Sequence, residues 1–126
     1  IFIHVFAHRK ESYLFEVEHK RDWMAEYFFT GGMMPSINFL PSTAKSFKEL
    51  NRWEINGEHY SKTLEAWLSK QDHQEDKIKE QFSNTYGKDA KLWIQRWRLF
   101  YLACSELFAY NGGNEWLVMH YLLAKR

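Results

Sequence analysis

Residues 93–126, WIQRWRLFYLACSELFAYNGGNEWLVMHYLLAKR, decide the fold class of this chain. Large apolar side chains recur there at three- and four-residue spacing, which predicts a helix with one broad buried face over residues 88–110. The pattern breaks at the Asn-Gly-Gly of residues 111–113, which tolerate positive φ and can end a helix. Residues 115–123 then form a mostly apolar run that is typical of a well-covered strand. A helix that feeds a strand in this way indicates an α/β domain.

The rest of the chain supplies two more strands and several helices. Residues 1–7 are apolar and β-favouring, which predicts a buried strand with neighbours on both sides. Residues 47–55 predict a second strand that is more exposed, and Asn56-Gly57 is a turn signal after it. Helices are predicted over residues 22–28 with Asp22 as the cap, 35–41, 58–70 and 71–86, while residues 13–18 are open between a loop and a short strand. Because a buried strand needs neighbours that this chain lacks, we expect the C-terminal part of a larger α/β domain.

Composition excludes several classes of protein. The chain has 126 residues, and its 17 Lys and Arg nearly cancel its 16 Asp and Glu, which disfavours nucleic acid as a partner. The single cysteine, Cys104, lies on an apolar helix face, so we expect a buried, reduced thiol without a catalytic role. No run approaches the ~20 apolar residues of a membrane span, and no signal-peptide pattern occurs. We therefore expect no transmembrane segment and a cytoplasmic location.

Motifs that hold cofactors, metals or nucleophiles are missing. The glycines form no G-x-G-x-x-G or phosphate-binding loop, and neither G-x-S-x-G nor H-E-x-x-H occurs. His4 and His8 share a strand face but would stand about 13 Å apart, which is too far for joint metal ligation. We therefore predict no metal ligands, no cofactor-binding residues and no catalytic residues within this chain.

Five segments resemble one family in the right order along nearly the whole chain. That family is the cyclopropane-fatty-acyl-phospholipid synthase family of S-adenosylmethionine-dependent methyltransferases, and within it the chain is most similar to the branch of plant coclaurine N-methyltransferases. The matching segments are HVFAHR (4–9), DWMAEYFFTGGMMPS (22–36), RWEINGEHYSKTLEAWL (52–68), TYGKDA (85–90) and WRLFYLACSELFAYNGGNEWLVMHYLL (97–123).

The resemblance implies a fold and a division of labour. The fold would be the C-terminal portion of a class I, Rossmann-like methyltransferase, in which residues 1–7, 47–55 and 115–123 are the fifth, sixth and seventh strands. The seventh strand would be inserted antiparallel between the other two. Residues 1–126 would form the substrate side of a single methyltransferase domain, while S-adenosylmethionine would bind mainly to an upstream half that this chain lacks. The Glu-His pair associated with the acceptor would lie there too, so we expect this chain to be inactive alone.

The resemblance also implies a substrate wall. In the N-methyltransferase branch, aromatic residues of a WRxFF segment line the amine pocket. The segment maps onto Trp97 and Phe100, with Tyr101 in the place of the second Phe. A cationic amine gains about 0.5–2 kcal/mol against such ring faces. We therefore predict that Trp97, Phe100 and Tyr101 bind a small-molecule amine.

Three hypotheses follow, and two departures from the family pattern separate the first two. Cyclopropane synthases carry His where this chain has Glu54, and Tyr where it has Phe100. Both departures favour an amine methyltransferase over an enzyme that modifies unsaturated lipid chains. The third hypothesis is a non-catalytic module that uses this surface for binding or for dimerisation, and a homodimer is also compatible with the first two. The hypothesis of a non-catalytic module is favoured only if this chain is a complete gene product.

Overall fold

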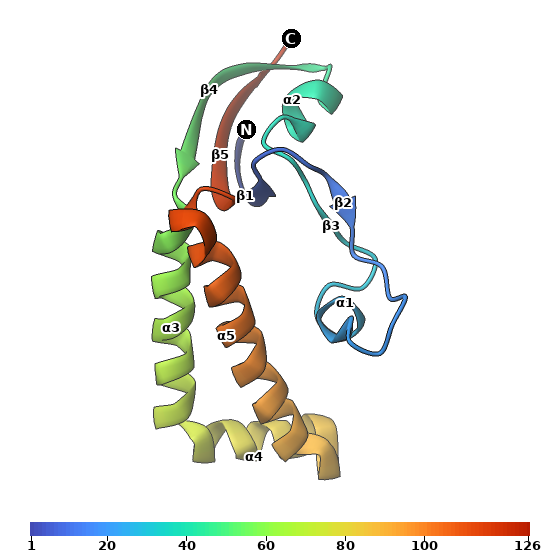
Figure 1. Ribbon diagram of the computed structural model, residues 1–126, viewed down its shortest axis with the longest axis vertical. Coiled ribbons are helices and arrows are strands. Elements are labelled where there is room, and N and C mark those ends of the chain that lie inside the picture. The colour runs from blue at the N-terminus through green and yellow to red at the C-terminus, as the bar shows by residue number, and fades with distance from the viewer.

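The computed structural model describes residues 1–126, and its sheet joins strands from both ends and the middle of the sequence (Figure 1). β1 (Phe2–His8), β4 (Phe47–Ile55) and β5 (Trp116–Lys125) lie in the order β1-β5-β4. β5 is antiparallel to both neighbours, so β1 and β4 run in the same direction. The predicted mixed α/β fold is confirmed, including the last strand inserted antiparallel between the other two.

One face of β5 carries the main core. Buried side chains alternate along this face with the period of a strand: Leu117, Met119, Tyr121 and Leu123. The short helix α2 (Phe39–Thr43) and the turn before it contribute Ile37 and Leu40 to the same cluster. The Tyr121 hydroxyl donates a hydrogen bond to the Ile37 carbonyl at 2.8 Å, so the polar end of this buried ring is satisfied.

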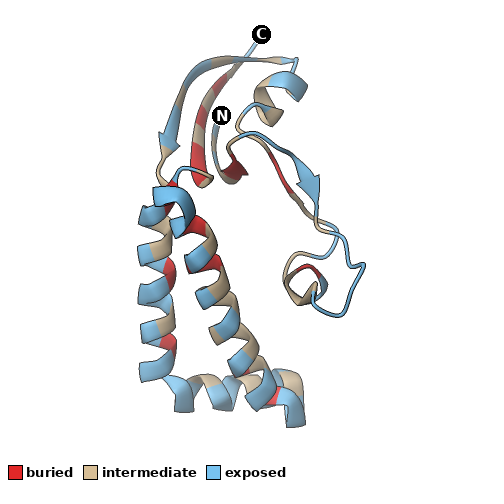
Figure 2. Ribbon diagram, in the orientation of Figure 1, coloured by how far each residue is buried: buried red, intermediate tan, exposed pale blue.

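The first strand is less covered than its composition predicts. β1 pairs with β5 on one side only, and Phe2 is 57% exposed. Figure 2 shows burial concentrated along β5 and at the carboxyl end of β1. Burial of this strand is confirmed at its carboxyl end, where Ala7 and His8 are buried, whereas the first half pairs with β5 along one edge and is less covered. An apolar strand with a free edge is an aggregation hazard.

Two long helices extend from the carboxyl end of the sheet and are joined by a third (Figure 1). α3 (Gly57–His73) packs against α5 (Ala90–Gly113), and α4 (Glu75–Tyr86) followed by the short turn η1 (Gly87–Asp89) connects them. Leu64, Cys104 and Phe108 form the buried contact between α3 and α5. α3 is longer than the predicted 58–70 because Gln71 is buried and its amide donates to the Ile94 carbonyl at 3.1 Å.

The end of α5 interlocks with the start of α3. Asn111, Gly112 and Gly113 have φ of 53°, 62° and 73°, so the predicted Asn-Gly-Gly turn is confirmed. The Asn56 side chain accepts a hydrogen bond from the Glu58 amide and donates one to the Gly112 carbonyl, both at 2.8 Å. One side chain thus caps α3 and also holds the turn that leads into β5.

A separate segment stands opposite α5 and consists of β2 (Tyr13–Leu14), α1 (Trp23–Tyr27) and β3 (Met33–Met34). β2 pairs antiparallel with β3, which resolves the ambiguity of residues 13–18 and adds a strand that the sequence did not predict. Asp22 precedes α1 as predicted, yet its carboxylate accepts from the amides of Glu18 and His19 instead of capping the helix. The predicted helix at 35–41 begins only at Phe39, because the Ile37 amide binds the His8 carbonyl and holds that stretch against β1.

Candidate binding cavity

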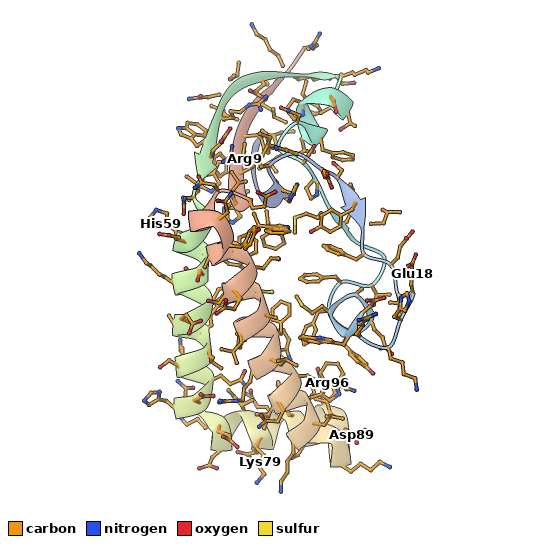
Figure 3. All side chains as sticks on the ribbon, in the orientation of Figure 1. Arg9, Glu18, His59, Lys79, Asp89 and Arg96 are labelled. Atoms are coloured by element: carbon orange, nitrogen blue, oxygen red, sulfur yellow. The ribbon has the colours of Figure 1, made fainter.

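An apolar cavity of about 280 Å³ lies between α5 and the segment formed by β2, α1 and β3. Its volume is near the lower end of the range for small-molecule pockets. Figure 3 shows the side chains of both elements reaching into the space between them, with Glu18 on the outer side of the segment. The lining residues are Phe6, Tyr13, Leu14, Phe15, Glu16, Asp22, Met24, Ala25, Phe29, Met34, Tyr60, Phe100, Cys104, Leu107 and Phe108.

The cavity lies beyond the carboxyl end of β1. Phe6, near that end, contributes to its wall, and the chain then turns into β2 and the residues beside it. Open α/β sheets bind their ligands outside the carboxyl ends of the strands, where the connecting segments provide the contacts. The position of this cavity therefore agrees with the general rule for such sheets.

Packed aromatic rings hold the wall on both sides. Phe100 of α5 lines the cavity and stacks on Phe28 with ring centroids 4.4 Å apart and an angle of 20° between the planes. Phe15 stacks on Phe29 at 4.9 Å, and Phe29 contacts Phe100 at 5.6 Å. These contacts connect the segment to α5 and leave aromatic surface for a ligand.

The structure brings one of the three predicted substrate residues to the cavity. Phe100 lines it, whereas Trp97 packs edge-on against Phe28 and Phe100 with centroids 4.9 and 5.5 Å away and lies outside the lining. The indole nitrogen of Trp97 is buried without a hydrogen-bond partner. Tyr101 packs against Trp67 at 6.2 Å and borders a different, open hollow between α3, α4 and α5.

A hydrogen-bonded cluster anchors β2 beside the cavity. The Trp116 indole donates to the Tyr13 hydroxyl at 3.0 Å. His8 accepts from the amides of Lys10 and Glu11 through Nδ1, so its proton resides on Nε2, which is 3.0 Å from a Glu115 carboxylate oxygen. These bonds join the carboxyl end of β1, the start of β5 and the first residue of β2.

Glu54, which replaces the His of cyclopropane synthases, is engaged elsewhere. Its carboxylate pairs with Arg9 at 3.0 Å, and Arg9 also donates to the Asn114 carbonyl. This pair ties the carboxyl end of β4 to the chain just after β1 and does not line the cavity. In this chain Glu54 therefore has a structural contact where the other branch carries His.

The cavity carries acidic but no basic side chains. Glu16 and Asp22 are its two charged residues, and no Lys, Arg or His lines it. Hydrogen bonds from the backbone amides of His19 and Glu18 lower the pKa of Asp22, so its carboxylate remains ionised at neutral pH. Glu16 takes part in no hydrogen bond or ion pair within the chain. The lining is thus suited to neutral or cationic ligands.

Cys104 lines the cavity as an unreactive thiol. It is 4% exposed, and burial raises its pKa from 9.0 to about 12. The prediction of a buried cysteine is confirmed, and its raised pKa keeps the thiol protonated at neutral pH. The nearby Tyr60 hydroxyl likewise has a raised pKa, first through burial and then through Cys104 and Tyr101.

The buried tyrosine and cysteine side chains should make the folded protein less stable at alkaline pH. Burial raises the pKa of Tyr60, Tyr101, Cys104 and Tyr121 above the ordinary values of 10.0 for Tyr and 9.0 for Cys. The unfolded chain therefore releases these protons at lower pH than the folded chain. We expect the urea midpoint to be steady between about pH 7 and 9 and to fall as pH rises toward about 12. Tyr101→Phe should flatten this fall, and a midpoint that is unchanged between pH 8 and 11 would contradict the prediction.

Sequence reasoning missed most of the cavity wall. Phe6, Phe15, Phe29, Tyr60 and Phe108 come from four separate regions of the chain, and no spacing rule connects them. The clusters of aromatic residues at 13–15 and 27–29 were a signal that could have identified the segment opposite α5. Three-dimensional packing was needed to bring these clusters against the predicted helix face.

The cavity does not by itself fit S-adenosylmethionine. That molecule carries an amino-acid carboxylate and a ribose, yet the lining offers no basic group and no glycine backbone. No group of three or more His, Cys, Asp or Glu in the chain could hold a metal ion either.

The mixed sheet and its helices show this chain to be a portion of a class I methyltransferase fold. The sequence model of the mycolic acid cyclopropane synthetase family matches residues 1–116, so the chain belongs to that family. The resemblance found in the five sequence segments is confirmed.

The relatives that the chain matches are N-methyltransferases. It is 34% identical to (S)-coclaurine N-methyltransferase and 31% identical to pavine N-methyltransferase, both of Thalictrum flavum subsp. glaucum. Each match covers 100% of this chain and 36% of the relative. A crystal structure of coclaurine N-methyltransferase bound to N-methylheliamine and SAH matches 98% of this chain and 37% of its own, with a TM-score of 0.86 and 34% identity. The chain thus spans little more than a third of the length of these proteins.

Proposed function

We propose that this chain is the substrate-side part of an S-adenosylmethionine-dependent N-methyltransferase that acts on a small-molecule amine carrying an aromatic ring. The observation that carries the proposal is the aromatic cavity, which has two carboxylates and no basic group in its lining. The similarity to several plant N-methyltransferases supports it. S-adenosylmethionine would supply the methyl group, and residues outside this chain would hold it.

The residues of this chain would bind and orient the acceptor. Phe100 would present its ring to the ammonium or to the aromatic part of the substrate, and its stack on Phe28 keeps that ring in place. Trp97 would act behind Phe100 by supporting its position, and Tyr101 stays a weaker candidate because it borders another hollow. A substrate that is held in one orientation reacts faster, since less translational and rotational freedom is lost in the transition state.

The alternative is a cyclopropane synthase that modifies unsaturated acyl chains. Membership of a family named for cyclopropane synthesis favours it. The acidic lining argues against it, because a negatively charged cavity repels anionic phospholipid head groups. Phe100 and Glu54, which replace the Tyr and His of that branch, argue in the same direction.

Three further predictions concern the location, the assembly and the domain organisation of the protein. None of its helices combines the length and the apolarity that a bilayer crossing requires. A cytoplasmic location and a homodimer stay predictions, as does the assignment of residues 1–126 to a single methyltransferase domain.

A labelling assay tests the proposed function. The protein would be expressed with all residues that its gene encodes before Ile1 and given S-adenosylmethionine with a labelled methyl group. We expect label to enter coclaurine or a simpler ring-bearing secondary amine, and not the acyl chains of unsaturated phosphatidylglycerol vesicles. Label in the acyl chains alone would establish the lipid alternative. Label in neither would favour a module that only binds.

A further inference from the structure

The two carboxylates at the cavity differ in how far the chain itself engages them: one oxygen of Asp22 is bound, whereas neither oxygen of Glu16 has a partner. Oδ2 of Asp22 accepts hydrogen bonds from the backbone amides of Glu18 and His19 at 3.0 and 2.8 Å, and the ring Nδ1 of His19 lies 3.8 Å from the same oxygen. Glu16 has no such partner, and none of the five ion pairs of the chain includes it. A carboxylate without a partner at the border of an apolar cavity can pair with a cation at little cost.

The residue before Glu16 is anchored to the rest of the segment. Phe15 is fixed by its stack on Phe29, and its amide donates to the Gly32 carbonyl at 3.0 Å. Glu16 therefore follows an anchored residue just after β2, and it borders the same cavity as Phe100. A ligand in the cavity would lie between an aromatic wall and this carboxylate.

We infer that Glu16 is the residue that selects cationic ligands for this cavity, by pairing with the ammonium of the substrate or product. The inference rests on the proposed amine methyltransferase function and names the binding group for the positive charge. The aromatic rings attract a cation through their faces, and the carboxylate adds attraction of opposite charge from the other side. Because Glu16 is exposed, water screens part of this attraction, so the effect should be several-fold.

The test compares two ligands of the same shape that differ in charge. Benzyltrimethylammonium carries a permanent positive charge, whereas (2,2-dimethylpropyl)benzene is its neutral counterpart. Their dissociation constants would be measured by NMR titration on the protein with all its encoded residues, as wild type, Glu16→Gln and Glu26→Gln. Glu26 is an exposed acid on α1 outside the cavity lining, which makes it a matched control.

We expect Glu16→Gln to weaken binding of the cation about five-fold and to leave binding of the neutral ligand unchanged. Glu26→Gln should change neither. An equal loss for both ligands, or no loss for either, would overturn the role of Glu16 even if the protein still methylates amines. If the wild type binds neither ligand and methylates no amine, both the role of Glu16 and the proposed function are wrong. Melting curves of each variant would show that the fold is intact.

Discussion

Gly57→Ala should cost about 3 kcal/mol or more of unfolding free energy, a large effect for a single methyl group. A Cβ at position 57 would overlap the carbonyl oxygens of both Trp116 and Phe108. Both are backbone atoms, so relief of the overlap would require the start of α3 to move away from α5 and β5. Urea unfolding followed by circular dichroism would measure the loss.

A second glycine provides the control for this prediction. Gly31 has a φ of 72°, and no atom lies within 4 Å of the position of its Cβ, so Gly31→Ala tests backbone strain without overlap. We expect this variant to lose about 1 kcal/mol. Equal losses for the two variants would show that the contact between α3, α5 and β5 is looser than the structure indicates.

The contact between α3, α5 and β5 around Gly57 should also affect ligand binding. Tyr60 and Phe108 line the cavity and pack edge-on with ring centroids 4.8 Å apart, one from each helix. A shift between α3 and α5 would separate these rings. Gly57→Ala should therefore also weaken binding of benzyltrimethylammonium at temperatures where the protein is still folded.

Phe100→Leu should lower kcat/KM for an aromatic amine about ten-fold in the protein with all its encoded residues. The substitution keeps an apolar side chain but removes the ring face, and cation–π attraction of about 0.5–2 kcal/mol corresponds to roughly a 2- to 30-fold effect. It also removes the stack on Phe28, which orients the wall. Steady-state methylation kinetics would measure the change.

Two companion variants make this prediction specific. Phe100→Tyr keeps the ring and should retain most of the activity, although Tyr is the residue of the cyclopropane branch. Tyr101→Leu should reduce kcat/KM less than three-fold, because Tyr101 borders a different hollow. A larger loss of kcat/KM from Tyr101→Leu than from Phe100→Leu would contradict this prediction. It would support the role in substrate binding that the sequence motif assigned to Tyr101.

The elements with regular patterns could be predicted from the sequence. The strand at residues 47–55 has the predicted bounds, and α5 and the Asn-Gly-Gly turn after it follow from helical spacing and tolerance of positive φ. β3 could not be predicted, because a strand of two residues has no measurable period and exists only through its pairing with β2. The bounds of α3 depended on Gln71, a polar residue whose burial is decided by its bond to the Ile94 carbonyl.

The candidate site, too, was predicted in part from the sequence and in part only from the tertiary structure. The aromatic face of the last helix and the family of the chain were evident from sequence alone, since spacing and motifs are local properties. The structure decided which aromatic residue borders the cavity: Phe100 does, while Trp97 and Tyr101 lie beside it, one helical turn or less away. Glu16 became a candidate only once β2 and α1 were placed opposite α5. Contacts between residues about 80 positions apart depend on tertiary packing, which local patterns of side chains do not encode.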